Sequence, residues 1–203
     1  MFRLFLSAAA IGLAVAAPVG PMSLLCMRRT LAQGWRTGFA TGAGIASGDA
    51  TYALVAGLGL AGVQGFMLTH ERGLHLAAGL FLLYLGTKTV LAAGRSTDRG
   101  AARAASRRAA YGSALLLTLT NPPTIIMFAG VFAALAPASG FAPGTALLTV
   151  AGVFAGSLLW WLGLTAAVAA LRGVLGARVR TWIDRISGAA LALFGLAEIR
   201  RAL

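Results

Sequence analysis

Long apolar runs alternate with short polar stretches along all 203 residues of the chain. Six such runs can be marked, at residues 2–27, 36–63, 73–93, 111–136, 144–171 and 183–203. A helix needs about 20 residues to cross a hydrocarbon core roughly 30 Å thick, and each run is long enough to do so. The pattern therefore predicts an all-α membrane protein with six transmembrane helices.

The composition agrees with a chain that lives in a lipid bilayer. Hydrophobic residues make up 59% of the chain and charged residues 11%, and the mean hydropathy is +0.84. A soluble domain carries roughly 25% charged residues. The formal net charge of +12 would point to nucleic acid in a soluble protein. No nucleic-acid-binding module is legible, so we expect the bilayer and not nucleic acid as the partner of the basic residues.

The basic residues are distributed unevenly between the two sides that six crossings create. Thirteen of the seventeen lie in or beside the connections that follow the first, third and fifth runs: Arg28, Arg29, Arg36, Lys88, Arg95, Arg99, Arg103, Arg107, Arg108, Arg172, Arg178, Arg180 and Arg185. Cytoplasmic loops collect arginine and lysine, so these connections are expected in the cytoplasm, where they could also attract anionic lipid. Both termini would then face the periplasm or exterior, and residues 94–110 would form a basic cytoplasmic linker.

The first run has some features of a cleavable signal peptide. Arg3 gives it a charged start, and the small residues at 14–16 resemble a cleavage site. The run nevertheless continues past Pro21 to Met27, and it ends on two arginines. We therefore interpret it as a spanning segment.

The two halves of the chain resemble each other in the order and spacing of their small residues. In the second run these are Gly44, Gly48, Asp49 and Tyr52, and in the fifth run Gly152, Gly156, Ser157 and Trp160 take the same relative positions. Gly79 and Gly86 of the third run are seven apart, as are Gly188 and Gly195 of the sixth. With three crossings each, residues 1–93 and 111–203 would be inverted three-helix repeats, which are common in secondary transporters. The 27 glycines leave coincidence as the alternative.

Prolines interrupt the first and fourth runs. Pro18 and Pro21 lie inside the first, and Pro122 and Pro123 follow Asn121 inside the fourth. A proline removes a backbone donor, and a broken helix survives at membrane depth only where it is buried or lines a wet cavity. Matched breaks in two halves indicate a transporter's central site, and a packing kink without a ligand is the alternative. The candidate substrate-binding residues at the breaks are Gly20, Pro21, Asn121 and Pro122.

Asp49 is the one acidic residue expected deep in the bilayer. A charge at the bilayer centre costs about 2.5–3.5 kcal/mol on insertion scales, and such residues usually serve a substrate or proton path. Asp49 could carry a proton reversibly, could pair with a substrate ammonium group, or could be purely structural. Gly48 and Tyr52 adjoin it as further candidates, and Tyr52, Trp160 and Trp161 could line a cavity or pack in the core.

Several other chemistries find little support in the sequence. Cys26 is the single cysteine, and His70 and His75 are interpreted as isolated interfacial side chains, so no metal site or other cofactor is expected. Gly34, Gly38 and Gly42 are spaced by four, as are Gly44 and Gly48, without the Gly-Lys-Ser/Thr ending of a phosphate loop. This small-residue spacing is typical of close helix packing, and it fits a homodimer or purely internal contacts.

These residues together resemble the LysE/RhtB family of amino-acid exporters. The likeness lies in the break at residues 18–21, the glycines that end in Gly48-Asp49, the third-run positions 79–88, the asparagine and proline at 121–122, and the last run from 186 to 195. It covers nearly the whole chain. Two positions depart from the family pattern: Pro123 stands where a lysine is usual, and Val19 widens the first motif by one residue.

The resemblance implies a six-helix exporter that moves amino acids or related small metabolites out of the bacterial cytoplasm. It would be a proton-driven antiporter in the inner membrane, working by alternating access. Export of a cation or another small solute is the alternative, although the chain lacks the Cys/His/carboxylate cluster that transition metals prefer. Two alternatives come from other functional classes. A membrane enzyme would need paired acids or a nucleophile–base set at depth, and the chain shows neither. A non-transporting scaffold is the other alternative.

Overall fold

The computed structural model describes residues 1–18, 20–57, 69–93, 106–121, 124, 127–128, 143–172 and 176–203, without the side chains at 71, 92, 143, 177 and 180. Every regular element in these ranges is a helix. The helices are α1 (Phe2–Ala16), α2 (Pro21–Gln33), α3 (Trp35–Gly57), α5 (Glu71–Ala92), α6 (Arg107–Leu119), α8 (Pro143–Arg172) and α9 (Ala177–Ala202). The all-α prediction is confirmed for this part of the chain.

Two of the described helices are long and apolar enough to cross a membrane, over Arg72–Leu91 and Gly144–Arg172. A third crossing results if α1 and α2, which meet at 82°, count as one bent span. Helix α3 is less apolar because it carries Thr41 and Asp49, but both side chains are buried inside the bundle. The described helices fit a membrane protein, and the count of six crossings stays a prediction.

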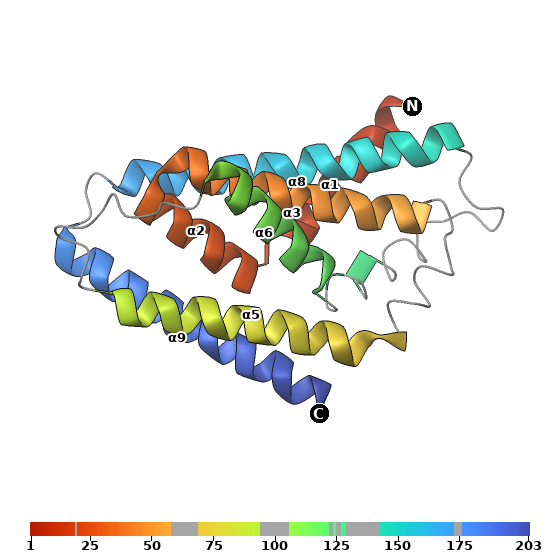
Figure 1. Ribbon diagram of the computed structural model, residues 1–203. Coiled ribbons are helices and arrows are strands. Elements are labelled where there is room, and N and C mark those ends of the chain that lie inside the picture. Colours follow the sequence, from red (N-terminus) through yellow and green to blue (C-terminus); the bar gives the residue numbers. More distant parts are fainter. Residues whose placement is uncertain are drawn as a thin grey trace.

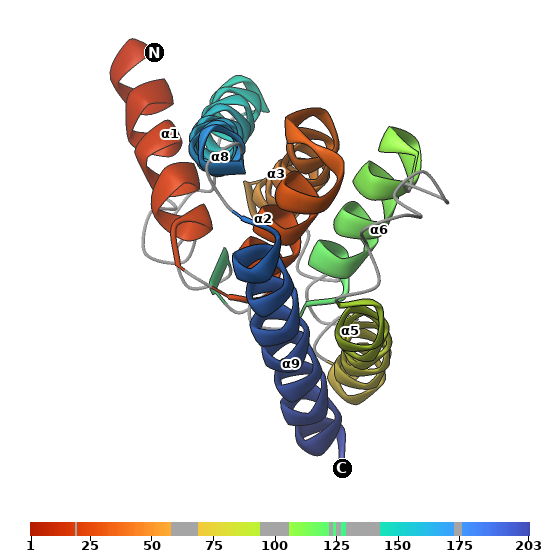
Figure 2. The same cartoon turned by 90° about the vertical axis from the view of Figure 1, so that its left-hand side faces the viewer.

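The helices form a row of four with a pair beneath it. Viewed along the bundle, the row runs α1, α8, α3 and α6, while α5 and α9 pack on each other below (Figure 2). Both termini lie toward one end of the bundle, and the α2–α3 and α8–α9 junctions lie at the opposite end (Figure 1). The termini therefore share an end, as expected, and the compartment they face stays a prediction.

Glycines bring neighbouring helices of the row into close contact. A Cβ on Gly156 would lie within 2 Å of the Ala9 carbonyl oxygen of α1, and one on Gly44 would lie 2.3 Å from the Tyr111 carbonyl oxygen of α6. Gly42 faces Trp161 of α8 in the same way. The glycines of α3 are thus used for packing within the chain, which is one of the two interpretations that their spacing allowed.

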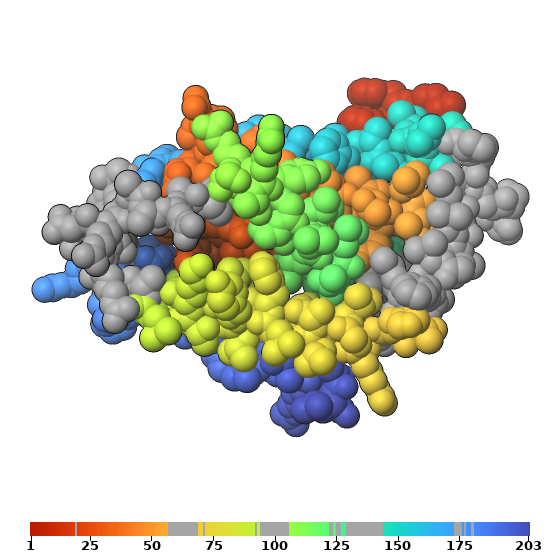
Figure 3. Space-filling view, in the orientation of Figure 1, coloured from red at the N-terminus to blue at the C-terminus, as the bar shows by residue number. Residues whose placement is uncertain are grey.

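The α5–α9 pair is joined in a similar way. Gly79 meets the Gly195 carbonyl, and Gly86 meets the Gly188 carbonyl, in opposite sequence order, so the two helices are antiparallel. The pair attaches to the rest of the bundle through a shared apolar cluster in which Leu25 of α2 and Leu117 of α6 take part: Leu25, Ala78, Leu82, Leu117 and Leu191. Figure 3 shows α5 and α6 side by side on one face of the molecule.

The first proline break is present as predicted. Helix α1 ends at Ala16, Gly20 is extended (φ −136°, ψ −168°), and Pro21 begins α2. A residue before proline avoids the helical region, and proline suits the first helical position because its missing N–H would have no helical partner there. The Ser23 hydroxyl donates to the Pro18 carbonyl at 3.2 Å and so satisfies one carbonyl at the break.

The end of this first run was predicted wrongly. Helix α2 continues beyond Met27 to Gln33, and it ends where Gly34 adopts a left-handed conformation (φ +92°). Arg28 and Arg29 therefore belong to a helix and not to a loop. Two adjacent arginines look like the end of a span in sequence, but arginine is a good helix former, and the helix continues to the glycine at position 34.

One substitution tests the close packing of α5 on α9. In Gly86→Ala, the new Cβ would lie 2.5 Å from the Ala192 nitrogen and 2.6 Å from the Gly188 oxygen. Such overpacking is expected to lower the free energy of unfolding by about 1–3 kcal/mol, measured by denaturation in detergent. The matched control is Gly163→Ala, where nothing lies within 4 Å. Alanine there should leave stability unchanged or raise it by up to about 1 kcal/mol. Equal effects at both positions would contradict this account of the interface.

Candidate functional site

Helix α3 presents three of the predicted site residues, and they face different neighbours. Asp49 is 3% exposed and points to α8, whereas Gly48 and Tyr52 face the end of α6. Residues one apart on a helix are about 100° apart around its axis, so adjacent positions contact different helices. Because α3 lies between α8 and α6, its Asp49 contacts α8 and its Gly48 packs against α6.

Asp49 takes part in a short chain of hydrogen bonds. The Ser157 hydroxyl donates to Asp49 Oδ2 at 2.7 Å, and Trp161 Nε1 donates to the Ser157 oxygen at 3.2 Å. Ser157 and Trp161 are both on α8 and both buried. Among the described contacts of Asp49 there is no cation, so neutral donors alone serve this buried carboxyl group. The group is thus chemically able to exchange a proton or to accept a ligand's ammonium.

Tyr52 compensates for the second proline break. The carbonyls of Thr118 and Leu119 would normally accept from the N–H groups four residues later, but positions 122 and 123 are prolines and have none. The Tyr52 hydroxyl lies 2.7 Å from the Leu119 carbonyl oxygen and 3.4 Å from that of Thr118. Tyr52 is 3% exposed, and its ring also stacks on Phe128, with the ring centroids 6.0 Å apart. Its described contacts therefore give Tyr52 a role in holding the break.

The remaining candidates divide between two places. Asn121 follows the last turn of α6 and donates from Nδ2 to the Thr124 hydroxyl at 2.9 Å, while Gly48 packs on Thr118 one turn earlier. Pro122 lies outside the described residues. Gly20 and Pro21 begin α2, and their described contacts include neither Asp49 nor Asn121. The structure thus brings Gly48 and Tyr52 to the second break, and it does not join the first break to them.

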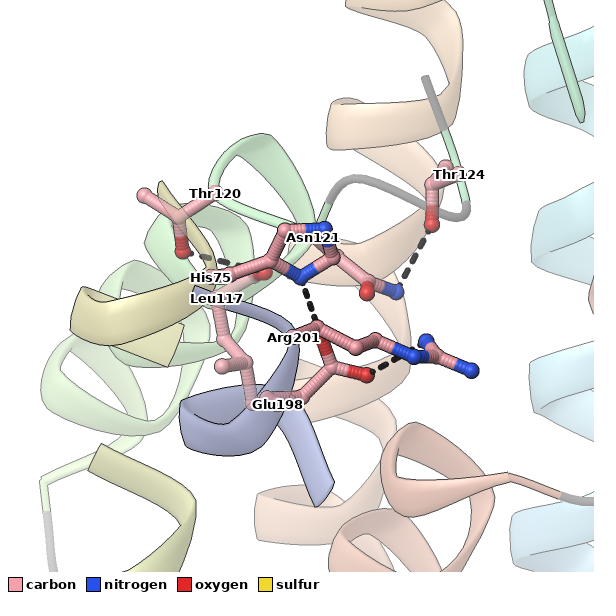
Figure 4. A network of polar contacts seen from close by, with 7 residues as sticks. All are labelled: His75, Leu117, Thr120, Asn121, Thr124, Glu198 and Arg201. Atoms are coloured by element: carbon pink, nitrogen blue, oxygen red, sulfur yellow. Dashed lines mark hydrogen bonds and ion pairs between the residues drawn. The ribbon is translucent and has the colours of Figure 1, made fainter. Parts of the chain in front are cut away.

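A buried contact between an imidazole and a carboxyl group was missed in the sequence. His75 of α5 and Glu198 of α9 are 5% and 8% exposed, and His75 Nδ1 lies 2.5 Å from Glu198 Oε2 (Figure 4). Arg201 also donates to this carboxylate at 3.0 Å. The interpretation of His75 as an isolated interfacial side chain was wrong, because α9 passes directly over it. The register of the antiparallel glycine contacts brings position 75 next to position 198, and this register is visible only in the structure.

Arg29 is a second buried group that the sequence placed wrongly in a loop. Its side chain is 8% exposed and reaches from α2 to both α3 and α6. Nη1 donates to the Thr41 hydroxyl at 3.2 Å and to the Ala110 carbonyl at 2.9 Å, and Nη2 donates to the Ser113 hydroxyl at 2.9 Å. No local sequence signal marks this position. Arg28 and Arg29 are adjacent and identical, and the sequence does not tell which of the two faces the interior.

Other potential sites can be judged only within the described ranges. There, no three histidine, cysteine or acidic side chains lie together as metal ligands would. Trp161, which could have lined a cavity, is 2% exposed and packs in a core with Cys26 and Ala114. Among the described residues, the buried acidic and basic side chains are Arg29, Asp49 and the contacting residues His75 and Glu198.

Comparisons with known proteins agree with a translocator. The model of the LysE type translocator family matches residues 13–201. A Bacillus subtilis (strain 168) protein named "Putative amino acid efflux protein YcgF" is 25% identical over 197 residues, which cover 95% of this chain and 93% of that protein. The "Chemotactic transduction protein ChpE" of Pseudomonas aeruginosa is 29% identical over 181 residues, or 85% of each chain. No solved structure matches.

The His75–Glu198 pair can be tested with a double-mutant cycle. His75→Gln, Glu198→Gln and the double variant should each be unfolded in detergent. Since the two side chains touch inside the α5–α9 interface, we expect a coupling free energy of about 0.5–3 kcal/mol. Strictly additive effects would show that the contact contributes nothing to stability. His70→Gln, at an exposed position, is the matched control and should not couple to Glu198.

Proposed function

Because the chain belongs to the LysE type translocator family, we propose that it is a secondary exporter of amino acids or related small metabolites. It would act in the bacterial inner membrane as a proton-coupled antiporter with alternating access. The family match and the relative named as an amino acid efflux protein support the substrate class. The buried carboxyl group of Asp49 is the observation that carries the coupling mechanism.

Asp49 has the surroundings that proton exchange requires. It sits at the central α3–α8 contact, and it is held by the Ser157 hydroxyl without a described cation. A carboxylate in a poorly solvated site gains much from either a proton or an ammonium group, because each removes an unpaired buried charge. The two can therefore replace each other. Protonation from the outside would release a substrate ammonium, and substrate loading from the cytoplasm would release the proton.

Contacts between matched positions support an inverted repeat. Under a two-fold axis, each residue on the axis meets its own equivalent, and off-axis contacts occur twice. Asp49 and Ser157 occupy equivalent positions in the two halves, and they contact each other. The Gly79–Gly195 contact maps onto the Gly188–Gly86 contact in the same way. This pattern favours two related halves over a coincidence of glycines.

The helix arrangement extends this argument to whole elements. The axis that exchanges α3 with α8 also exchanges α1 with α6, and the α1–α8 contact then corresponds to the α6–α3 contact. The pair α5 and α9 would exchange with each other. Inverted repeats of this kind let a transporter open alternately to the two sides by rocking one part against another. Residues 1–93 and 111–203 are the two halves in this proposal.

Other functions predict different outcomes. A cation exporter would move ions and not amino acids, and an enzyme would convert a substrate in detergent without a gradient. A scaffold, to which the name of the chemotactic relative would point, should tolerate a neutral residue at position 49. The transport experiment therefore has to compare substrates, gradients and variants together.

Efflux of preloaded labelled amino acids from proteoliposomes tests the proposal. With a pH gradient imposed, acid on the receiving side, wild type should export at least one amino acid faster than without a gradient. Asp49→Asn should fall to background, because the amide cannot carry the proton. Asp184→Asn, on α9 beside Arg28, is the control and should retain transport. If Asp49→Asn exported the amino acid as fast as wild type and responded equally to the pH gradient, the assigned role of Asp49 would be contradicted.

Cysteine labelling tests the orientation. Cys26 is the single cysteine and is buried, so Cys26→Ser provides a cysteine-free background. Arg108 and Arg72 are exposed residues in the first turns of α6 and α5, and the starts of these two helices lie toward opposite ends of the bundle (Figure 1), so each can be replaced by cysteine. The outer membrane of the cells is permeabilised and the inner membrane is left intact. A maleimide that cannot cross the inner membrane should then label position 72, and it should label position 108 only after the inner membrane is broken. The reverse pattern would place the basic connections outside the cytoplasm.

A further inference from the structure

The guanidinium of Arg29 is held on two of its edges by fixed protein groups. Ala110 O accepts from Nη1 and Ser113 Oγ accepts from Nη2, and these two acceptors are themselves 3.2 Å apart. They therefore occupy the edge between Nη1 and Nη2. The Thr41 hydroxyl accepts from the outer side of Nη1. These three acceptors come from α3 and α6, so the two helices fix the orientation of a side chain that α2 supplies.

The third edge of this guanidinium is unused in the described structure. An arginine has five N–H donors, and the three hydrogen bonds above leave Nε–H and one Nη2–H without a described acceptor. These two donors are parallel and lie on the same edge. A carboxylate binds such an edge with one oxygen on each N–H, which is the strong bidentate arrangement of arginine with carboxylates.

The charge of Arg29 is also uncompensated in the described chain. The described acceptors are two hydroxyls and one carbonyl, all neutral, and the adjacent charged residue is another arginine, Arg28. No described acidic side chain is within ion-pair distance of Arg29. A buried cation without an anion is costly, and neutral hydrogen bonds offset only part of that cost. An anionic ligand would complete the site.

A role in packing alone does not explain why an arginine stands here. In the other half, the stretch that follows the second break, residues 124–140, contains no charged residue at all. If the repeated fold needed a cation after each break, the second half would carry one too. Arg29 therefore belongs to one side of the exporter only, the end of the bundle with the α2–α3 junction (Figure 1). In the proposed orientation this is the cytoplasmic end, where substrate loads.

We propose that Arg29 binds the carboxylate of the exported substrate at its cytoplasmic entrance and thereby selects amino acids over amines. This inference rests on the proposed function and adds a second binding position to it. Thr41, which holds Arg29, lies eight residues before Asp49 on α3, a rise of about 12 Å. A simple amino acid is too short to span that distance. Substrate thus meets Arg29 first and Asp49 afterwards.

Competition between matched ligands tests this assignment. Inside-out vesicles that contain the full chain are given the labelled amino acid that wild type transports best. Unlabelled leucine and leucinamide, which differ only in the carboxylate, then compete at the cytoplasmic face. Wild type should prefer leucine, and Arg29→Gln should reduce that preference by about tenfold to a hundredfold, as expected for hydrogen bonds to charged groups. Most of the change should be weaker competition by leucine, with leucinamide little affected.

Two further variants separate recognition from folding. Arg28→Gln changes the adjacent arginine on α2 and should keep the wild-type preference. Arg29→Lys keeps the charge but cannot present the two-donor edge, and it should restore only part of the preference. If Arg29→Gln lowered the uptake of every ligand equally and left the preference for leucine over leucinamide unchanged, the assignment would be overturned. Arg29 would then be a structural residue.

A binding measurement distinguishes failure of this inference from failure of the proposed function. In detergent, leucine should raise the midpoint temperature of thermal unfolding of wild type. It should raise that of Arg29→Gln less, and leucinamide should raise neither. If wild type shows this pattern but exports no amino acid, the carboxylate site stands and the exporter function falls. If amino acids are exported and Arg29→Gln keeps full discrimination, the function stands and the site falls. If no carboxylate ligand binds wild type, Arg29 has no such role.

Discussion

The absence of water around a chain in hydrocarbon is the constraint on which this structure depends. Every backbone carbonyl and N–H there must find a partner inside the protein. The two adjacent prolines after Asn121 withdraw two N–H donors from the end of α6. The Asn121 N–H serves the Thr118 carbonyl in their place, and the Tyr52 hydroxyl of α3 donates to the Leu119 carbonyl at 2.7 Å. At the first break the Ser23 hydroxyl serves the Pro18 carbonyl. Broken helices are tolerated because nearby side chains replace the lost donors.

Such replacement requires helices that lie very close together, and glycine makes this possible. Gly48 lets Thr118 pack directly on α3, which brings the end of α6 within reach of Tyr52 one turn later. The same spacing brings α8 close enough for Ser157 to bond Asp49. A glycine-poor version of these faces would move the helices apart and take the Tyr52 hydroxyl away from the Leu119 carbonyl. Close packing and the polar site are therefore one arrangement.

The three buried ionisable centres differ in how their charge is compensated. Glu198 has both His75 and Arg201 as partners, so its charge is internally paired. Asp49 and Arg29 have only neutral partners in the described chain. A paired charge holds helices together, whereas a charge with neutral partners gains free energy from a ligand of opposite sign. Asp49 and Arg29 would therefore gain from a ligand of opposite charge, whereas the charge of Glu198 is already offset within the α5–α9 pair.

The sequence by itself determined the helical class, the first proline break and the close-packed glycine faces, and it marked Asp49 as the acid to expect in the interior. Those features follow from local composition and spacing, which a single stretch of chain displays. Only the tertiary structure decided that Arg29 is buried and that His75 meets Glu198, 123 positions away. The same is true of Tyr52, which completes the end of a helix that begins 55 residues later. A long polar side chain can reach several neighbours, and which one it reaches depends on helix register, which local sequence does not encode.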